Sequence, residues 1–404
     1  MPGQIKKTDV KRFILITGLL LLFAAEILRV YFIMPFPGSQ KTDSINFAYW
    51  LGRNISWIRI LLIALVAWPL VQSFRHNKIW KKILLGVVVI GYSIIFYFFN
   101  FRFEADKMFY QPKHKKFSAV NTSGADSILV IGVAINGEAK AFPIQIIGYH
   151  HQVVDTIGNT AAIITYCTVC RTGRVFSPMV NGRPEVFRLV GMDHFNAMFE
   201  DASTSSWWQQ ATGVAIAGPL KGHSLTEIPS QQLTLASWMK MYPNSTVLEP
   251  DSSFKKQYEN LAGYNKGTIH GSLERRDSGS WQQKSWVVGI RHQKNEKAYD
   301  WNELVKKEVI EDSLPGLPVL LVLENDTASF HVWNRQVDGV SLHFTKNRSQ
   351  NTISDLGTQS TWDMNGICTD GILKGRKLAI VQSYQEFWHS WKNFHPGTLS
   401  YMSK

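Results

Sequence analysis

The chain has 404 residues, 45% of them hydrophobic, and carries 43 basic against 31 acidic side chains. The basic residues are scattered and several flank apolar runs, which is typical of membrane topology and argues against a nucleic-acid-binding protein. Long apolar runs fill the chain between Phe13 and Phe103, whereas those beyond Glu104 are short and separated by Gly, Asn and Pro. We therefore expect lipid-facing helices followed by a globular region.

Three apolar runs predict an N-terminal bundle of three transmembrane helices, at about 13–35, 57–74 and 83–101. The first run has no clear small-residue cleavage site, which favours an uncleaved helix over a signal peptide. Within it, Glu26 and Arg29 are three residues apart on one helix face, where each can partly neutralise the other.

The loop after the second run contains four basic residues, Arg75, Lys78, Lys81 and Lys82. Together with the basic amino terminus, it is predicted to lie in the cytoplasm. The third helix then leads outward. We predict a multi-pass protein of the cytoplasmic (inner) membrane, with a soluble domain on the periplasmic or extracellular side. The lipid bilayer is the predicted partner, no nucleic-acid partner is expected, and a protein partner or substrate is left open.

An internal repeat organises the soluble region. Residues 130–142 match residues 287–299 at one constant offset, which also superposes Asp155 on Asp312. Tryptophans recur in the same order, Trp208 and Trp238 in the first copy and Trp362 and Trp391 in the second. After a transmembrane region at 1–103, we therefore predict two copies of one unit at 104–255 and 256–404, packed as a pseudo-symmetric pair.

Local patterns predict a β-rich α+β fold for each copy. In the first, Asn136-Gly137 separates two apolar runs and predicts a β-hairpin. Residues 144–150 are expected to form a short helix, 151–156 and 161–167 two strands, and 237–242 a helix that Pro243 ends.

Cys167 and Cys170 form a C-x-x-C tetrad. The residues that follow, with Thr172-Gly173 between short β-like runs, predict a turn between strands, which favours a metal knuckle over a redox dithiol at a helix start. In an oxidising compartment the pair could also be a simple disulfide. Cys368 has no partner at a suitable spacing and is expected to be a small buried hydrophobe.

A knuckle supplies only two ligands, and His150 and His151 are the candidate additional ligands. They are predicted to open the strand that precedes the cysteine strand, and alternation lets only one of them face the thiols. His194 and Asp155 are weaker candidates. Thiolate with imidazole suits zinc or copper. The second copy has Lys307-Glu308 and residues 324–327 at these positions, so both pairs are lost together, which indicates that they serve one site.

The stretch GVAINGEAKAFPIQIIGYHHQVVDTIGNTAAIITYCTVCRTGRVF resembles the domain-of-unknown-function family numbered 3179. That family typically has a strand ending in Y-C-P-x-C-G, preceded by an H-E-x-x-x-D segment. His150, Asp155, Cys167 and Cys170 match the family's His, Asp and cysteines, and the match covers residues 128 to about 250 well. The chain departs from the pattern at Thr168, Arg171 and His151, where the family usually has Pro, Gly and Glu. The family name implies no established reaction.

The leading hypothesis is a membrane-tethered extracytoplasmic domain that binds zinc or copper through Cys167, Cys170 and His150, with a further ligand unassigned and any reaction left open. One alternative is a thiol-disulfide redox protein in which Cys167 is an exposed nucleophile and His150 tunes its pKa. Another is a non-catalytic scaffold or interaction module in which a disulfide joins two strands.

Overall fold

The computed structural model describes residues 7–119 and 127–402. The chain divides into two compact units. The first comprises Met1–Tyr110, Val186–Gln209 and Val214–His223, and the second comprises Gln111–Glu185, Gln210–Gly213 and Ser224–Lys404. A segment from the middle of the chain thus belongs with the amino-terminal helices.

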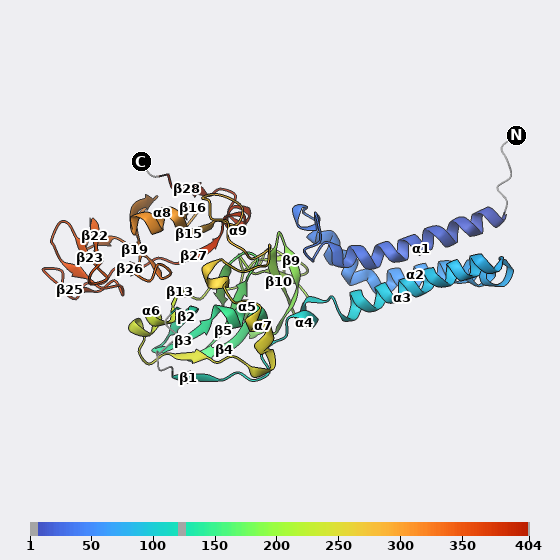
Figure 1. Cartoon of the computed structure of the whole chain (residues 1–404), viewed down its shortest axis with the longest axis horizontal. Coiled ribbons are helices and arrows are strands. Elements are labelled where there is room, and N and C mark those ends of the chain that lie inside the picture. The colour runs from blue at the N-terminus through green and yellow to red at the C-terminus, as the bar shows by residue number, and fades with distance from the viewer. Residues whose placement is uncertain (1–6, 120–126, 403–404) are drawn as a thin grey trace. The chain divides into compact units, whose positions relative to one another are not determined.

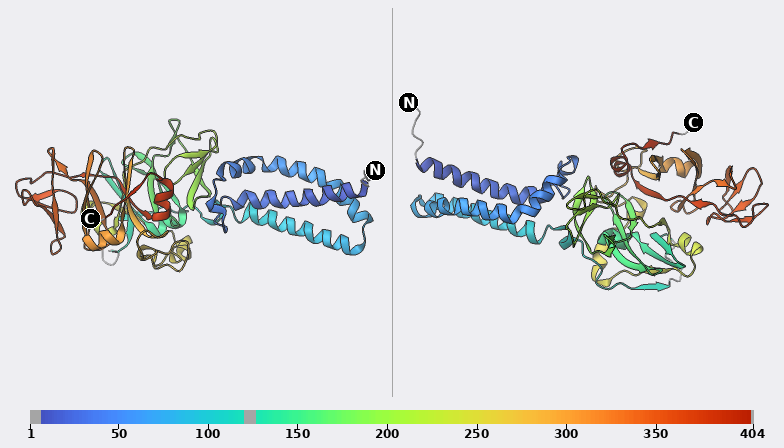
Figure 2. Two further views of the ribbon diagram at one scale, coloured as in Figure 1. Left: turned by 90° about the horizontal axis from the view of Figure 1, so that it is seen from above. Right: turned by 180° about the vertical axis from the view of Figure 1, so that it is seen from behind.

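Three long helices, α1 (Lys7–Tyr31), α2 (Ile45–His76) and α3 (Ile79–Phe101), run side by side in the first unit (Figures 1 and 2). Each is long and apolar enough to cross a membrane. At about 1.5 Å per residue, even α3 extends roughly 35 Å, which exceeds a hydrocarbon core of about 30 Å. Three candidate membrane helices before a β-rich region are therefore confirmed within the described residues.

The second helix begins earlier than predicted, at Ile45 rather than near Trp57. The residues buried along its first turns, Ile45, Ala48, Leu51 and Ile55, recur at three- and four-residue spacing. This spacing places one apolar stripe on the helix, and packing of that stripe extends the helix through a stretch whose polar residues resemble a loop.

A polar cluster joins the three helices. Arg59 of α2 donates to both carboxylate oxygens of Glu26, with Nε–Oε1 2.6 Å and Nη2–Oε2 2.7 Å. Asn100 of α3 donates to the same carboxylate at 3.1 Å and accepts from Arg29 at 2.9 Å. The main partner of Glu26 is thus Arg59 on a neighbouring helix and not Arg29 on its own helix. The two parallel bonds of an arginine to a carboxylate make this ion pair stronger than a single bond would. Arg29 itself lies 3.6 Å from Glu104.

A four-stranded sheet, ordered β12-β11-β10-β9, completes the first unit together with the short helix α4 (Ala105–Met108). Its strands are β9 (Phe187–Asp193), β10 (Asn196–Asp201), β11 (Trp207–Gln209) and β12 (Ala215–Ala217). Val190, Met198 and Trp207 pack in one apolar cluster with the start of α2. At Gly191 an added Cβ would lie 2.3 Å from the Ile33 carbonyl oxygen, so only glycine permits this close approach.

The second unit begins with two small sheets, ordered β1-β14-β3-β2-β13 and β4-β5-β6. The predicted hairpin at Asn136-Gly137 is confirmed, with both residues at positive φ, and so are the short helix and the two strands that follow. The elements are β1 (Phe117–Ala119), β2 (Leu129–Ile135), β3 (Glu138–Pro143), α5 (Ile144–His150), β4 (Gln152–Ile157), β5 (Thr160–Cys167), β6 (Thr172–Phe176), β7 (Met179–Val180), β8 (Arg183–Pro184), β13 (Gln231–Thr234), α6 (Leu235–Met241), β14 (Thr246–Leu248) and α7 (Lys255–Glu259).

The rest of the second unit forms sheets ordered β27-β15-β16-β28, β17-β18-β19-β26 and β22-β23-β24-β25. Its elements are β15 (Trp286–His292), β16 (Asn295–Asp300), α8 (Trp301–Lys307), β17 (Val309–Leu314), β18 (Leu317–Leu323), β19 (Phe330–Asn334), β20 (Gln336–Val337), β21 (Val340–Ser341), β22 (Phe344–Asn347), β23 (Thr352–Asp355), β24 (Thr361–Trp362), β25 (Cys368–Asp370), β26 (Ala379–Ile380), β27 (Ser383–Phe387), α9 (Trp388–Phe394) and β28 (Leu399–Ser400).

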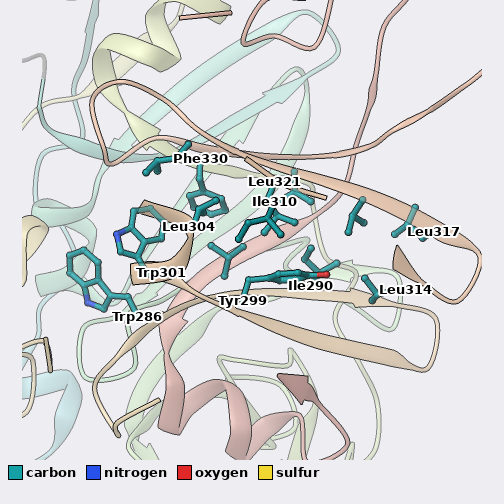
Figure 3. Packing of buried hydrophobic residues seen from close by; sticks show 14 of the residues in the cluster. Trp286, Ile290, Tyr299, Trp301, Leu304, Ile310, Leu314, Leu317, Leu321 and Phe330 are labelled. Carbon is teal, nitrogen blue, oxygen red and sulfur yellow. The ribbon is translucent and has the colours of Figure 1, made fainter. Parts of the chain in front are cut away.

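Apolar residues of β15, β17 and β18 pack with α8 in one buried cluster. Trp286 lies at one end of the cluster and Leu317 at the other (Figure 3).

Two tryptophans pack against glycines of long strands. An added Cβ at Gly132 of β2 would lie 2.3 Å from Trp238, and one at Gly289 of β15 would lie 2.2 Å from Trp391. Only glycine leaves room for these side chains.

The polar cluster of the helices makes the first prediction. Arg59→Met leaves the Glu26 carboxylate without its bidentate partner, and loss of one member of a buried pair costs about 3–5 kcal/mol. We expect the thermal unfolding midpoint of the full chain in detergent to fall clearly. Addition of Glu26→Gln should recover most of this loss, whereas the exposed control Arg53→Met should leave the midpoint unchanged. An Arg59→Met protein as stable as the wild type would contradict a structural role for the pair.

Candidate functional site

The C-x-x-C tetrad is a buried turn between two strands, as predicted. Cys167 ends β5 and β6 begins at Thr172. Cys167 and Cys170 are fully buried, lie 4.0 Å apart and are not joined by a disulfide. The expectation of an exposed Cys167 nucleophile is therefore wrong. Cys368 lies in β25 and is buried in an apolar cluster, as predicted.

The backbone of this turn is held by donors from distant parts of the chain. They come from the segment that precedes β15 and from the end of β27. The three bonds run from Tyr264 Oη to the Thr168 carbonyl (2.9 Å), from Lys284 Nζ to the Val169 carbonyl (2.6 Å) and from the Phe387 amide to the Cys170 carbonyl (3.0 Å). The shape of the turn therefore depends on long-range packing as well as on its own four residues.

A half-buried ammonium group, that of Lys284, acts on the two thiols. Besides its bond to the turn, Lys284 Nζ contacts His389 Nε2 at 3.1 Å and lies 4.7 Å from the centre of the Phe387 ring. Burial lowers the pKa of Lys284, and the neighbouring Cys170 and Cys167 act in the opposite direction. Burial and Lys284 together lower the pKa of His389 to about 3, so its imidazole is neutral near pH 7.

The thiol of Cys170 is held protonated by its surroundings. Burial, followed by the hydrogen bond and charge of Cys167, raises the pKa of Cys170 well above its ordinary value. The Ser390 hydroxyl and the Lys284 ammonium lower it and so favour the thiolate. A cation that bound both sulfurs would displace the protons, because thiolates and not thiols are metal ligands.

Arg171 closes the turn in a left-handed conformation, with φ 56°. Glycine adopts this conformation at little cost, so an arginine is an unusual residue at this place in the turn. In this chain the arginine side chain is itself buried. Its Nε donates to Gln385 Oε1 at 2.8 Å, and its guanidinium lies 3.8 Å from the centre of the Trp286 ring.

The two predicted histidine ligands lie at a helix end. α5 ends at His150, and His151 caps it with φ 61° and an amide bond to the Ile147 carbonyl at 2.8 Å. β4 starts only at Gln152. The prediction that both histidines open this strand is therefore wrong, because a left-handed residue is needed to turn the chain out of α5.

Each histidine makes contacts of its own. His150 Nε2 lies 2.7 Å from Tyr258 Oη, and the His151 carbonyl accepts from the Tyr166 amide at 3.0 Å. Burial lowers the pKa of His151 to about 4. In the described chain no group of three or more His, Cys, Asp or Glu side chains is placed to hold a metal ion. The two cysteines therefore lie together, but neither His150 nor His151 forms a three-residue metal-binding group with them.

No local pattern of residues pointed to the other groups around the thiols. Lys284 lies in a segment rich in polar residues and glycine, and His389 and Ser390 precede a core tryptophan. One pattern could have pointed to Ser390: the sequence Ser-Trp recurs as Ser237-Trp238, so this serine occupies a repeated position.

In residues 256–404, the carboxylate of Glu324 occupies the position that corresponds to the cysteine turn of residues 104–255. Glu324 follows β18 and is buried; it pairs with His331 Nε2 at 2.8 Å, accepts from Asn351 at 2.9 Å and binds the Ser237 hydroxyl. Burial opposes its ionisation, but the bonds from His331, Ser237 and Asn351 outweigh burial and lower the pKa of Glu324 to about 2.

A separate hollow of about 410 Å³ lies in the first unit and contains His194. The His194 Nδ1 lies 2.7 Å from Asp193 Oδ1, and its Nε2 lies 3.4 Å from Asp43 Oδ1. The hydrogen bond to Asp193 raises the pKa of His194 against the effect of burial. Two carboxylates therefore account for the orientation of this imidazole. Asp155, the other weak candidate, forms ion pairs with Lys115 and Lys140.

The fold and the site define a protein with three candidate membrane helices, a β-rich region and a buried dithiol turn. Residues 109–398 match the family described as Protein of unknown function (DUF3179), so the chain belongs to this family. Its sequence resemblance is thereby confirmed. Searches of curated proteins and of solved structures found no match.

The Glu324 cluster makes a prediction about acid stability. The folded-state pKa of about 2 lies below the ordinary 4.5, so its contribution is full above pH 4.5 and is lost as pH falls toward 2. We expect wild-type protein to lose up to about 3 kcal/mol more than Glu324→Gln over this interval. Urea unfolding at several pH values measures the difference. The exposed control Asp338→Asn should follow the wild type, and parallel pH profiles for wild type and Glu324→Gln would refute the assignment.

Proposed function

We propose that the protein is a membrane-anchored, extracytoplasmic metal-binding protein that takes up a soft monovalent cation, copper(I), through Cys167 and Cys170. The observation that carries the proposal is the pair of buried thiols, 4.0 Å apart, beside the Lys284 ammonium. Thiolates are soft ligands and suit copper(I) or zinc far better than magnesium or calcium.

The spacing of the two thiols fits two ligands of one ion. Zinc–sulfur bonds are about 2.3 Å long, so two thiolates on an ion of similar size lie at most about 4.6 Å apart. The separation of 4.0 Å between Cys167 and Cys170 is within this limit. Both sulfurs could therefore bind one ion with little movement of the turn.

Charge balance favours a monovalent ion. Two thiolates carry two negative charges, copper(I) supplies one positive charge and Lys284 supplies the other, so the buried site would be neutral. Neutrality matters because an unbalanced charge in such a place costs several kcal/mol. Zinc would leave a net positive charge beside Lys284, and it usually takes four ligands. The participation of His150 or His151 as a further ligand remains a prediction.

The decisive experiment measures metal in the full chain purified in detergent under reducing conditions. We expect close to one copper per chain after anaerobic loading, competed away only by strong copper(I) chelators. The double variant Cys167→Ser/Cys170→Ser should bind none, and Cys368→Ser should match the wild type. His150→Ala should leave binding unchanged if the two thiols suffice and weaken it if the histidine is a ligand.

Lys284→Met tests the charge argument separately. Loss of the ammonium should weaken copper(I) binding about tenfold, which corresponds to about 1.4 kcal/mol. Lys392→Met, an exposed control on α9, should have no effect. Stoichiometric zinc in place of copper, or equal copper uptake by the double cysteine variant, would refute the proposal.

A thiol-disulfide function is the second candidate, and the closeness of the two cysteines is the observation that favours it. Oxidation would join their sulfurs and pass two electrons and two protons to a disulfide partner, which becomes two thiols. Because both cysteines are buried, exchange would require the turn to open. Absence of copper binding together with a reversible dithiol couple would favour this candidate; absence of both would leave the scaffold hypothesis.

The extracytoplasmic location rests on the basic residues between α2 and α3 and at the amino terminus. We propose that these lie in the cytoplasm and that everything after α3 lies outside, in a multi-pass protein of the cytoplasmic membrane. A tag at the carboxy terminus should then be digested by protease added to the outside of spheroplasts, and one at the amino terminus should be protected. The opposite pattern would overturn the location.

We also propose that residues 104–255 and 256–404 are two copies of one unit. The order of elements supports this: β2-β3-α5-β4-β5-β6 in the first half corresponds to β15-β16-α8-β17-β18-β19 in the second. The caps of α5 and α8, His151 and Glu308, both have left-handed φ, at 61° and 62°. Asp201 and Asp355 each accept a tryptophan Nε1–H and the amides of a following threonine and serine.

Reciprocal contacts between the halves support a two-fold arrangement. The Ser237 hydroxyl of α6 donates to Glu324, which follows β18. The Ser390 hydroxyl of α9 bonds to Cys170, which follows β5, and lowers the pKa of its thiol. Gln232 and Gln385, at matching places in β13 and β27, bind each other at 2.8 Å. An experimental structure in which α6 did not reach Glu324 would contradict this arrangement.

A further inference from the structure

Arg171, Arg276 and Trp286 form a cluster of positive charge that the thiol site does not require. The Arg171 guanidinium lies 3.8 Å and the Arg276 guanidinium 4.2 Å from the centre of the same indole ring. Neither arginine forms an ion pair in the described part of the chain. Burial lowers the pKa of Arg276, the positive charge of Arg171 lowers it further, and the charge of Asp300 opposes both effects.

Three hydrogen-bond donors of this cluster are buried without an acceptor. They are Arg171 Nη2, Arg276 Nε and Trp286 Nε1. Arg171 is 1% exposed and Trp286 is 6% exposed, so bulk water does not serve these groups freely. A buried donor without an acceptor costs about 1–3 kcal/mol, and donors on charged groups cost more. Two of them belong to like charges and the third to the neutral indole, an arrangement that a bound anion would stabilise.

Other donors of the two guanidinium groups already bind the protein. Arg171 Nε donates to Gln385 Oε1, and its Nη1 reaches the Tyr264 carbonyl at 3.4 Å. Arg276 Nη2 donates to Asn302 Oδ1. These bonds fix both guanidinium groups against the indole, so the remaining donors are held in place before any ligand binds. Preorganised donors of this kind reduce the entropic cost of binding.

We propose that Arg171, Arg276 and Trp286 bind a small oxyanion, a carboxylate or a phosphate group. Guanidinium groups bind both classes through paired N–H donors, and the indole N–H adds a further donor. Arg276 is only partly buried, so the ligand reaches the site from the side of that residue. The site adjoins the thiol turn through Arg171, which directly follows Cys170, but it does not depend on the proposed metal.

Thermal unfolding of the full chain in detergent tests the site. Sodium phosphate and sodium acetate are titrated separately, with sodium chloride added to keep the ionic strength constant. We expect at least one anion to raise the unfolding midpoint with saturable dependence. Phosphate alone would identify a phosphate site, acetate alone a carboxylate site, and both a general oxyanion site.

Arg276→Gln should weaken the apparent affinity at least tenfold. Arg275→Gln, its exposed neighbour with the same change in charge, should respond like the wild type. Without added anion, Arg276→Gln should be no less stable than the wild type, because it removes one of two like charges. If Arg276 served only to stack on Trp286, the same change would lower the unfolding midpoint. Arg276→Lys keeps the charge and should bind more weakly than the wild type. No saturable rise in the wild type, or an unchanged response in Arg276→Gln, would overturn the proposal.

Discussion

The thiol site depends on one buried ion pair, between Arg174 of β6 and Glu386 of β27. Both side chains are almost fully buried, and the arginine also donates to the Ala211 carbonyl at 3.1 Å. Loss of either partner would leave an uncompensated charge in the interior, which makes such pairs strong determinants of how two strands lie together. With β27 fixed beside β6, the Phe387 amide reaches the Cys170 carbonyl, and His389 and Ser390 follow on α9 toward the turn.

Under the proposed duplication, one backbone plan supports two different buried polar sites. The turn after β5 carries two thiols and receives α9, whereas the turn after β18 carries Glu324 and receives α6. In the second case His331, Ser237 and Asn351 all bind the carboxylate, so its partners come from the chain itself. The thiols have an ammonium and a hydroxyl nearby, and under the proposed function they would bind an ion.

Local features of the fold could be predicted, and long-range ones could not. The Asn136-Gly137 hairpin, helix α5 and the turn at Cys167 follow from residue types within a few positions. The left-handed cap at His151 was missed because histidine carries little of the signal that glycine gives there. The start of α2 and the place of β9–β12 depend on packing between segments far apart in the sequence, which no local pattern reports.

The same limit applies to the site. The C-x-x-C spacing identified the two thiols, but their surroundings are set by distant residues, above all by the connecting segment 264–286 at the start of the proposed second copy. This connection supplies Tyr264 and Lys284 to the turn and Arg276 and Trp286 to the arginine cluster. Under the proposed duplication, a segment whose residues differ between the two copies can make one end of the scaffold different from the other. The electropositive surroundings of the thiols then come largely from this one segment, and the two proposed copies supply the frame that holds it.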